Sequence, residues 1–127
     1  MAPRKAAHRV MTRGEKVCAF IETYCRAPEG DLVGQPIKLQ PFQRDFILAV
    51  YDNPHGTSTG ILSIGRKNGK TALIAGILLA HLVGPEAVIN SQIVSGAMSK
   101  EQAAILFELA RKMVEMSDDL RPLVKVF

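Results

Sequence analysis

The chain has 127 residues, of which 47% are hydrophobic and 22% are charged, and this composition excludes an intrinsically disordered protein. The formal net charge is +4, and much of the excess lies in the first sixteen residues, where Glu15 alone opposes the basic side chains. The most apolar stretch, residues 72–83, is too short for a membrane-spanning helix, which needs about 20 residues. We therefore expect a soluble globular protein without membrane contact.

The first predicted element is a helix that begins near Thr12, after a basic stretch without a pattern. Its apolar residues recur every three or four positions, at Val17, Phe20, Ile21 and Tyr24. Thr12 and Glu15 have the spacing of a capping box, in which each side chain accepts a hydrogen bond from the backbone of the other residue. Proline and glycine residues between positions 28 and 36 then predict a loop.

A second helix is predicted from about Gln40, because Pro41 suits the first helical position. The apolar face of this helix consists of Phe42, Phe46, Ile47 and Val50. The turn-forming residues 52–56 predict its end.

Two short apolar segments, residues 59–64 and 87–95, are predicted to be strands, of which the first is bounded by turn residues and buried. Between them, residues 65–69 are predicted to form a loop. Residues 70–83 then predict a helix that is apolar on nearly every side, and such a helix is usually buried.

The last predicted helix begins after Ser99, which has Gln102 three residues later as a second capping box, and it ends near Met116. Residues 123–127 are apolar and extended, like the start of another strand. This alternation of strands and helices predicts an incomplete α/β fold, in which helices flank a parallel sheet.

The most informative stretch is the phosphate loop, the name used here for residues 64–71. The usual pattern for this kind of loop is G-x-x-x-x-G-K-[ST] between a strand and a helix. Gly69, Lys70 and Thr71 match the end of the pattern, whereas Ile64 stands where the first glycine is expected. The predicted strand before the loop and the predicted helix after it supply the required context.

Each matching residue has a chemical role in binding a polyphosphate. Gly69 lets the backbone approach closely, so that consecutive N–H groups can cradle the phosphate oxygens. Lys70 would place its ammonium group against the β- and γ-phosphates, and the Thr71 hydroxyl would complete the coordination of Mg²⁺. Arg66 and Lys67 add two more cations to a short loop, which is costly to assemble unless an anion neutralises them.

Residues 65–71 resemble the variant phosphate loop of terminase large subunits of tailed bacteriophages, in which the first glycine is commonly replaced. Two other stretches are similar to the same family: residues 39–46, which match a segment that contacts adenine, and residues 95–103, which match the second strand and the following helix. The resemblance runs from about Val33 to the end of the chain. It implies that Gln43 contacts adenine, and the alternative is an ordinary polar residue on a solvated helix face.

The resemblance implies a site for ATP and Mg²⁺. The predicted nucleotide-binding residues are Gln43, Gly65, Arg66, Lys67, Asn68, Gly69, Lys70 and Thr71. Thr71 is the predicted metal ligand. Arg66 and Lys70 are the predicted catalytic residues, because the arginine at this place in the family senses or stabilises the γ-phosphate.

The resemblance also implies a P-loop NTPase fold of the ASCE type and a motor that drives double-stranded DNA into a preformed capsid. The implied partners are double-stranded DNA, a portal ring, a small terminase subunit and further copies of the chain in a ring. The implied location is the host cytoplasm, with docking on the portal of the procapsid. On this basis residues 1–32 are a basic tail with a leading helix, and residues 33–127 are the N-terminal part of the ATPase domain.

Hydrolysis requires acidic residues that this sequence does not supply in the expected context. In P-loop ATPases one acid holds the metal and another polarises the attacking water at the end of an apolar strand. The only paired acids after the phosphate loop, Asp118 and Asp119, follow a helical pattern and are predicted to lie at a helix end or in a turn. We therefore expect the chain to end before the catalytic acids and a nuclease domain, and to turn over essentially no ATP alone.

Two other classes of function are compatible with parts of the sequence. Another P-loop NTPase, such as a kinase, a GTPase or a superfamily 2 helicase, would share the loop, and the helicase would also share the upstream glutamine. The guanine-reading pattern Asn-Lys-x-Asp of GTPases is absent from the sequence. A non-catalytic nucleic-acid-binding module would use the basic tail and the loop, although the chain has two tyrosines and no tryptophan to stack on bases.

Overall fold

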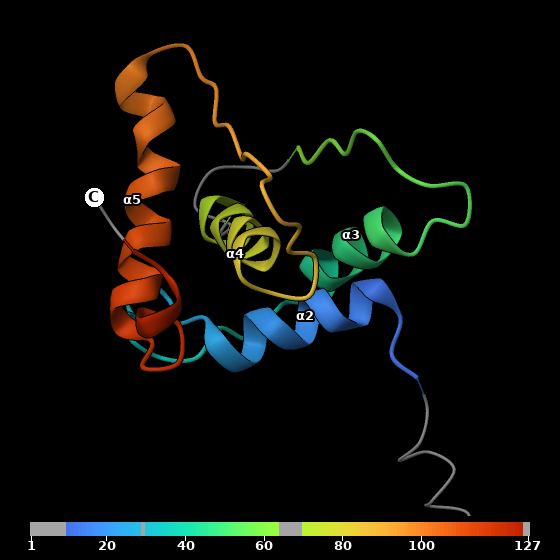
Figure 1. Cartoon of the computed structure of the whole chain (residues 1–127), viewed down its shortest axis with the longest axis horizontal. Helices are drawn as coiled ribbons and strands as arrows, with labels where there is room; N and C mark the ends of the chain where they lie inside the picture. The colour runs from blue at the N-terminus through green and yellow to red at the C-terminus, as the bar shows by residue number, and fades with distance from the viewer. Residues whose placement is uncertain (1–9, 29, 64–69, 126–127) are drawn as a thin grey trace, which may run out of the picture.

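The computed structural model describes residues 10–28, 30–63 and 70–125. The helices of this part of the chain are α2 (Arg13–Tyr24), α3 (Pro41–Tyr51), α4 (Lys70–Leu82) and α5 (Lys100–Met116), followed by the short 3-10 helix η1 (Arg121–Leu123). Figure 1 shows α4 nearly end-on, between α5 on one side and α3 on the other, with α2 crossing below. All four predicted helices are therefore confirmed.

The start of α2 is fixed by two sets of hydrogen bonds. Thr12 Oγ1 accepts from Glu15 N at 3.2 Å, and Glu15 Oε1 accepts from Thr12 N at 2.9 Å, which confirms the predicted capping box. Asp52, which follows α3, adds a second cap because its carboxylate accepts from Gly14 N at 2.8 Å and from the Thr12 hydroxyl at 2.7 Å. The beginning of α2 is thus tied to the end of α3.

α4 lies at the centre of the helices, packed against both α2 and α5. Its buried residues are Leu73, Ala75, Gly76, Leu79 and Ala80, which confirms the prediction of a buried helix for this side of α4. Small residues allow close packing: a Cβ atom on Gly76 would lie 3.2 Å from Ile21 Cγ1 of α2. α4 is therefore packed against α2 on one side and α5 on the other.

α5 also begins where the sequence predicts, since the Ser99 side chain accepts from Gln102 N at 3.2 Å. Its buried residues, Leu109, Ala110, Met113 and Val114, lie in the second half of the helix. Asp118 and Asp119 follow in a turn, which confirms that these acids do not end a strand.

The predicted strands form no sheet within the residues that the structure describes. The first, residues 59–64, is described as far as Ser63 and has no ladder partner there. The β-type pairing in the described part is an isolated antiparallel bridge between Arg26 and Pro36. A strand is stabilised by hydrogen bonds to a neighbouring strand, and an apolar pattern does not supply that neighbour.

The second predicted strand, residues 87–95, is wrong at its beginning. The backbone turns there, because Ser91 N donates to Val88 O at 3.3 Å and Asn90 has a φ of 63°. Asparagine tolerates this left-handed conformation because its short polar side chain can bond locally. The predicted strand at residues 123–127 is also wrong at Leu123, which ends η1, while residues 126–127 lie outside the described part.

Candidate nucleotide-binding site

Lys70 and Thr71, two of the predicted binding residues, open α4. Both residues are exposed, whereas Leu73 in the same turn is already buried. The first N–H groups of a helix have no partner within it, and together with the helix dipole they make a positive end that binds anions. The described part of the site is therefore an exposed cationic helix start on a firmly packed helix.

The remaining residues of the phosphate loop, numbers 64–69, lie outside the described part of the chain. They include the predicted binding residues Gly65, Arg66, Lys67, Asn68 and Gly69. Their contacts with phosphate therefore stay predictions.

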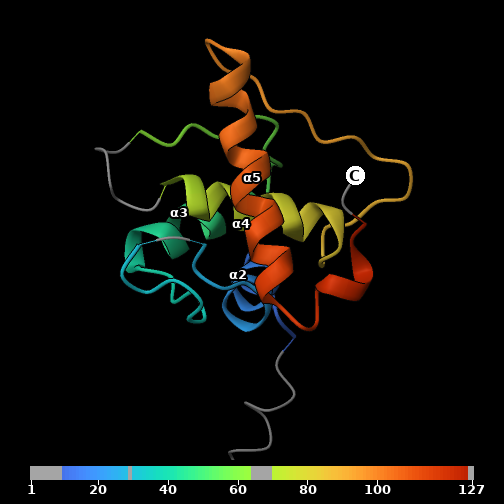
Figure 2. The same cartoon turned by 90° about the vertical axis from the view of Figure 1, so that its left-hand side faces the viewer.

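The segment that leads into the phosphate loop passes over α3. A Cβ atom on Gly60 would lie 3.2 Å from Val50 Cγ2 and 3.5 Å from Phe46 Cζ, and both of these residues belong to α3. Figure 2 shows α3 and the beginning of α4 on the same side of the molecule. Because α3 also carries Gln43, the fold brings the helix of the predicted adenine contact to the side where α4 begins.

Gln43 is the third residue of α3 and is only 8% exposed. Its Oε1 atom accepts a hydrogen bond from Gln40 N at 2.9 Å. The alternative of an ordinary polar residue on a solvated helix face is therefore wrong, because the side chain is buried and caps its own helix. The contact with adenine stays a prediction.

Two features that support this region were not identified from the sequence, namely the contacts of Glu22 and the cap between Gln40 and Gln43. Glu22 of α2 accepts a hydrogen bond at Oε2 from Leu39 N at 3.0 Å, and its Oε1 lies 3.8 Å from Arg44 Nη1. Glu22 and Leu39 are 17 positions apart, so no local spacing signals the contact. The cap between Gln40 and Gln43, by contrast, has the three-residue spacing of a capping box and could have been found.

The far end of α3 is joined to α2 and α4 by a polar cluster. Tyr51 Oη lies 2.6 Å from His81 Nε2 of α4. Arg13 of α2 donates to both carboxylate oxygens of Glu86, at 3.1 and 2.5 Å, and lies over the Tyr51 ring at 5.6 Å. The hydrogen bond from Arg13 lowers the pKa of Glu86, and burial raises the pKa of Tyr51. This cluster fixes the C-terminal end of α4.

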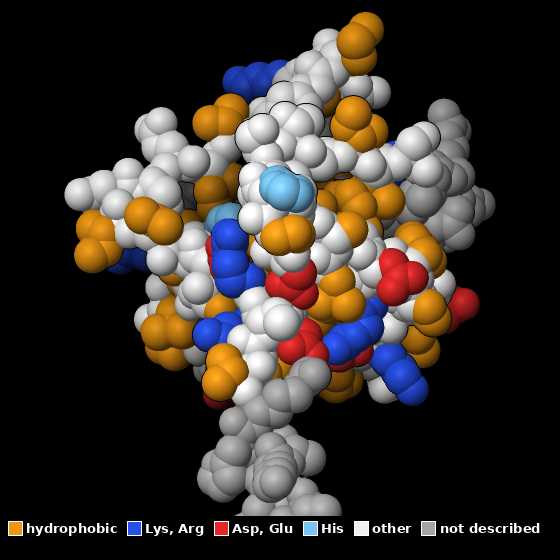
Figure 3. All heavy atoms as spheres, turned by 90° about the vertical axis from the view of Figure 1, so that its right-hand side faces the viewer, with side chains coloured by type: hydrophobic (Ala, Val, Ile, Leu, Met, Phe, Trp, Pro, Cys, Tyr) orange, Lys and Arg blue, Asp and Glu red, His pale blue; other side chains and the backbone are white. Residues whose placement is uncertain are grey.

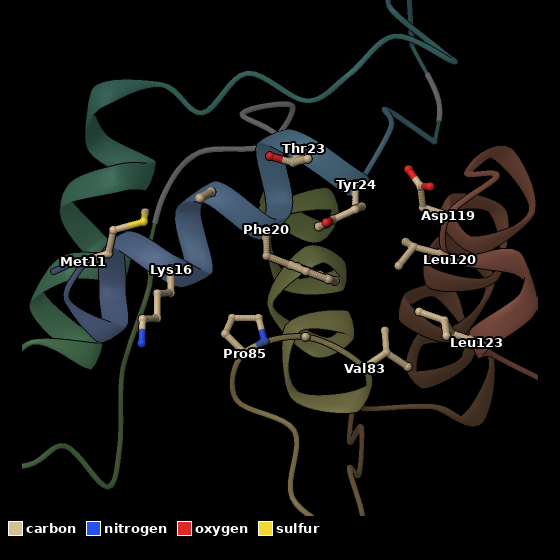
Figure 4. Close-up of a pocket in the computed structure, with 12 residues that line it drawn as sticks. Met11, Lys16, Phe20, Thr23, Tyr24, Val83, Pro85, Asp119, Leu120 and Leu123 are labelled. Atoms are coloured by element: carbon tan, nitrogen blue, oxygen red, sulfur yellow. The ribbon is translucent and has the colours of Figure 1, made fainter. Parts of the chain in front are cut away.

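A hollow of about 630 Å³ lies near this same end of α4. Figure 4 shows Phe20 of α2 and Leu120 from the chain after α5 on opposite sides of it. α4 has 13 residues, and at a rise of 1.5 Å per residue its C-terminal end is about 20 Å from Lys70. This hollow is therefore separate from the predicted nucleotide site.

The face of the molecule in Figure 3 carries basic and acidic side chains interspersed with one another. A protein that binds nucleic acid without catalysis gathers Lys and Arg into a continuous patch or stripe. This face offers no such surface.

Comparisons with known proteins agree on one family. A family model described as "Terminase large subunit, ATPase domain" matches residues 41–125. The chain is 70% identical over 116 residues to a protein of Enterobacteria phage HK97 named "Terminase, large subunit", with 91% of this chain and 23% of that protein covered. It is also similar to the crystal structure of the HK97 bacteriophage large terminase, with a TM-score of 0.85, 67% identity, and 92% of this chain and 24% of that chain covered. The chain thus spans less than a quarter of the length of either relative.

Proposed function

The chain belongs to the family of terminase large subunit ATPase domains, and on this premise we propose that it is the ATP-binding portion of the motor that packages viral double-stranded DNA into procapsids. One observation carries the proposal: Lys70 and Thr71 open the buried helix α4 directly after the glycines of the phosphate loop. Polyphosphate binding needs this order of loop, lysine, hydroxyl and helix start. The family match favours this function over a helicase or a non-catalytic module.

In this proposal the phosphate loop binds and orients the triphosphate. Lys70 binds the β- and γ-phosphates, and the N–H groups of residues 65–69 donate to their oxygens. Arg66 stabilises the charge that develops on the γ-phosphate. The Thr71 hydroxyl, exposed beside Lys70, is a hard oxygen ligand that suits Mg²⁺. When bound, Mg²⁺ supplies neutralisation of charge on the β- and γ-phosphates.

Gln43 is proposed to bind the adenine base. A glutamine amide matches the N6 and N7 atoms of adenine with one acceptor and one donor. The burial of Gln43 and its hydrogen bond from Gln40 N support this role, because both hold the amide in a defined place.

We also propose that residues 59–64 and the later part of the second segment, residues 91–95, join a parallel sheet of the ASCE type in the full-length protein. These two segments expose large apolar side chains, namely Ile61 at 84%, Ile93 at 41% and Val94 at 85%. Several exposed side chains of this size favour burial against another surface. In this proposal residues 33–127 form the N-terminal part of the ATPase domain, preceded by the tail and leading helix of residues 1–32.

For the whole protein we propose ATP hydrolysis coupled to the movement of double-stranded DNA. The proposed partners are a portal ring, a small terminase subunit and further copies in a ring, and the proposed location is the host cytoplasm at the procapsid portal. Family membership supports these proposals. No helix in the described part of the chain is long and apolar enough to cross a membrane.

We expect the 127-residue chain by itself to turn over essentially no ATP. Asp118 and Asp119 are exposed in the turn after α5, and Asp118 pairs with Arg121. Neither lies at the end of a strand, where an acid that polarises the attacking water is needed. Multiple-turnover hydrolysis by the isolated chain would overturn this expectation.

Equilibrium binding of a fluorescent ATP analogue to the full-length protein tests the nucleotide site. Lys70→Ala is expected to weaken binding by about tenfold or more, because it removes a charged donor to the phosphates. Lys112→Ala is the matched control, since Lys112 is an exposed lysine on α5, and it should keep the parent affinity. If Lys70→Ala binds the analogue as tightly as the parent does, the proposed site is wrong.

A further inference from the structure

We propose that Glu22 of α2 is a positioning residue that makes the nucleotide site select adenine over guanine. It acts through the backbone before α3 and through the side-chain amide of Gln43. The inference rests on the proposed function, in which Gln43 contacts the base. Glu22 itself touches neither the base nor the phosphates in this proposal.

The orientation of the Gln43 amide is fixed by the backbone. Gln40 N–H is a donor, so the atom of Gln43 that faces it at 2.9 Å must be the carbonyl oxygen Oε1. A flipped amide would point its NH₂ group at another donor and would lose this bond. A flip would therefore cost the part-buried hydrogen bond from Gln40 N to the 8% exposed Gln43 side chain. The amide is therefore held in one of its two orientations.

This orientation is the one that matches adenine. Adenine presents the N6 amino donor beside the N7 acceptor, whereas guanine presents two acceptors, O6 and N7. Oε1 of Gln43 has a second lone pair that can accept from adenine N6, while the amide nitrogen donates to N7. With guanine the same oxygen would face O6, and two acceptors would oppose each other. A flipped amide would meet O6 with its NH₂ group but would oppose Oε1 to N7, so neither orientation matches guanine, whereas the held orientation matches adenine at both atoms. Holding the amide in this orientation therefore favours ATP over GTP.

Glu22 holds both ends of the segment that fixes the amide. Before the segment, Glu22 Oε2 accepts from Leu39 N at 3.0 Å. After it, Glu22 Oε1 lies 3.8 Å from Arg44 Nη1. Gln40 and Gln43 lie between these two attachment points, and Leu39 is itself buried in the core. One carboxylate on a neighbouring helix therefore sets where the Gln40 N–H lies relative to Gln43.

The test compares the affinities of the full-length protein for fluorescent analogues of ATP and GTP. The parent is expected to prefer ATP by about tenfold or more, the discrimination that one bidentate base contact supplies. Gln43→Ala should bring the ratio close to one. Glu22→Ala should lower the ratio at least about fivefold, whereas Glu22→Gln keeps an acceptor for Leu39 N and should retain most of it. If Glu22→Ala does not fold, Arg44→Ala removes the second attachment and should shift the ratio in the same direction by less.

Glu86→Gln is the control for a purely structural effect. It removes the carboxylate that pairs with Arg13 at the other end of α2, so it should lower the melting temperature and leave the nucleotide ratio unchanged. The inference is overturned if Glu22→Ala lowers the melting temperature but keeps the parent ratio, or if the parent binds both nucleotides equally. A parent that binds neither nucleotide, or that binds ATP independently of Lys70, overturns the proposed function instead.

Discussion

Replacing Gly76 of α4 by alanine is expected to destabilise the parent protein but to stabilise the variant in which Ile21 of α2 is alanine. A Cβ atom on Gly76 would lie 3.2 Å from Ile21 Cγ1 and 3.4 Å from its Cδ1 and Cγ2 atoms. Ile21 is 0% exposed, so its side chain cannot move aside without displacing other core residues. The effect of Gly76→Ala on stability changes sign because Ile21→Ala removes Cγ1, Cδ1 and Cγ2, the three atoms that the new methyl group would crowd.

The magnitudes decide the sign in each background. Alanine in place of glycine inside a helix gains about 1 kcal/mol, whereas an extra methyl group in a filled core costs about 1–3 kcal/mol. Gly76→Ala should therefore cost the parent about 1 kcal/mol. Ile21→Ala alone should cost about 2–5 kcal/mol through the cavity it leaves. In that background Gly76→Ala keeps the helical gain and fills part of the cavity, so it should recover about 1 kcal/mol.

Urea unfolding of the 127-residue chain, followed by far-ultraviolet circular dichroism, measures the free energies of the four proteins in this cycle. The expected interaction energy is about 2 kcal/mol, within the range found for residues in contact. Gly96→Ala is the control, because a Cβ atom there would meet nothing within 4 Å and should act equally in both backgrounds. Equal effects of Gly76→Ala in the two backgrounds would refute the packing of α2 on α4.

Three further outcomes are expected. Burial raises the pKa of Cys25 to about 12, so dithionitrobenzoate should react with this thiol only on unfolding. Because the pKa of Cys25 is higher in the folded than in the unfolded chain, the stability that the neutral buried thiol contributes is present below about pH 9 and declines as the pH rises toward 12. Urea titrations at several pH values would detect this decline. The hydrogen bond from Arg13 lowers the pKa of Glu86, so the ionised Glu86 contributes to the free energy of unfolding above the ordinary pKa of 4.5, and this contribution is lost as the pH falls. Glu86→Gln should therefore make the free energy of unfolding less dependent on pH in the acid range. Thr12→Ala removes the α2 cap and the hydroxyl that donates to Asp52, and it should lower the unfolding free energy by about 1–2 kcal/mol in thermal melts.

The helices could be predicted from the sequence because their signals are local. Thr12 with Glu15, and Ser99 before α5, mark helix starts within a few residues, and the structure places caps at both. The strands depend on pairing with distant segments, so an apolar run alone was a poor guide. At Asn90 a left-handed residue turns the chain inside a run that otherwise looked extended.

The candidate site likewise contains residues that the sequence predicts and residues whose role appears only in the fold. Lys70 and Thr71 were predicted at the start of a buried helix, because the motif and the helical pattern lie side by side in the sequence. The role of Gln43 was suggested by resemblance, but its burial and fixed amide arise from the fold. The role of Glu22 could not be predicted from the sequence, because its contacts with Leu39 N and with Arg44 of α3 form only after α2 and α3 have packed.

A crystal structure of the full-length protein with Mg²⁺ and a non-hydrolysable ATP analogue would test the central claim most directly. We expect the β- and γ-phosphates within hydrogen-bonding distance of Lys70 Nζ and of the N–H groups of residues 65–69, with the adenine edge at Gln43. A nucleotide bound elsewhere, for example in the hollow at the C-terminal end of α4, or a Lys70 side chain directed away from the phosphates, would contradict the account.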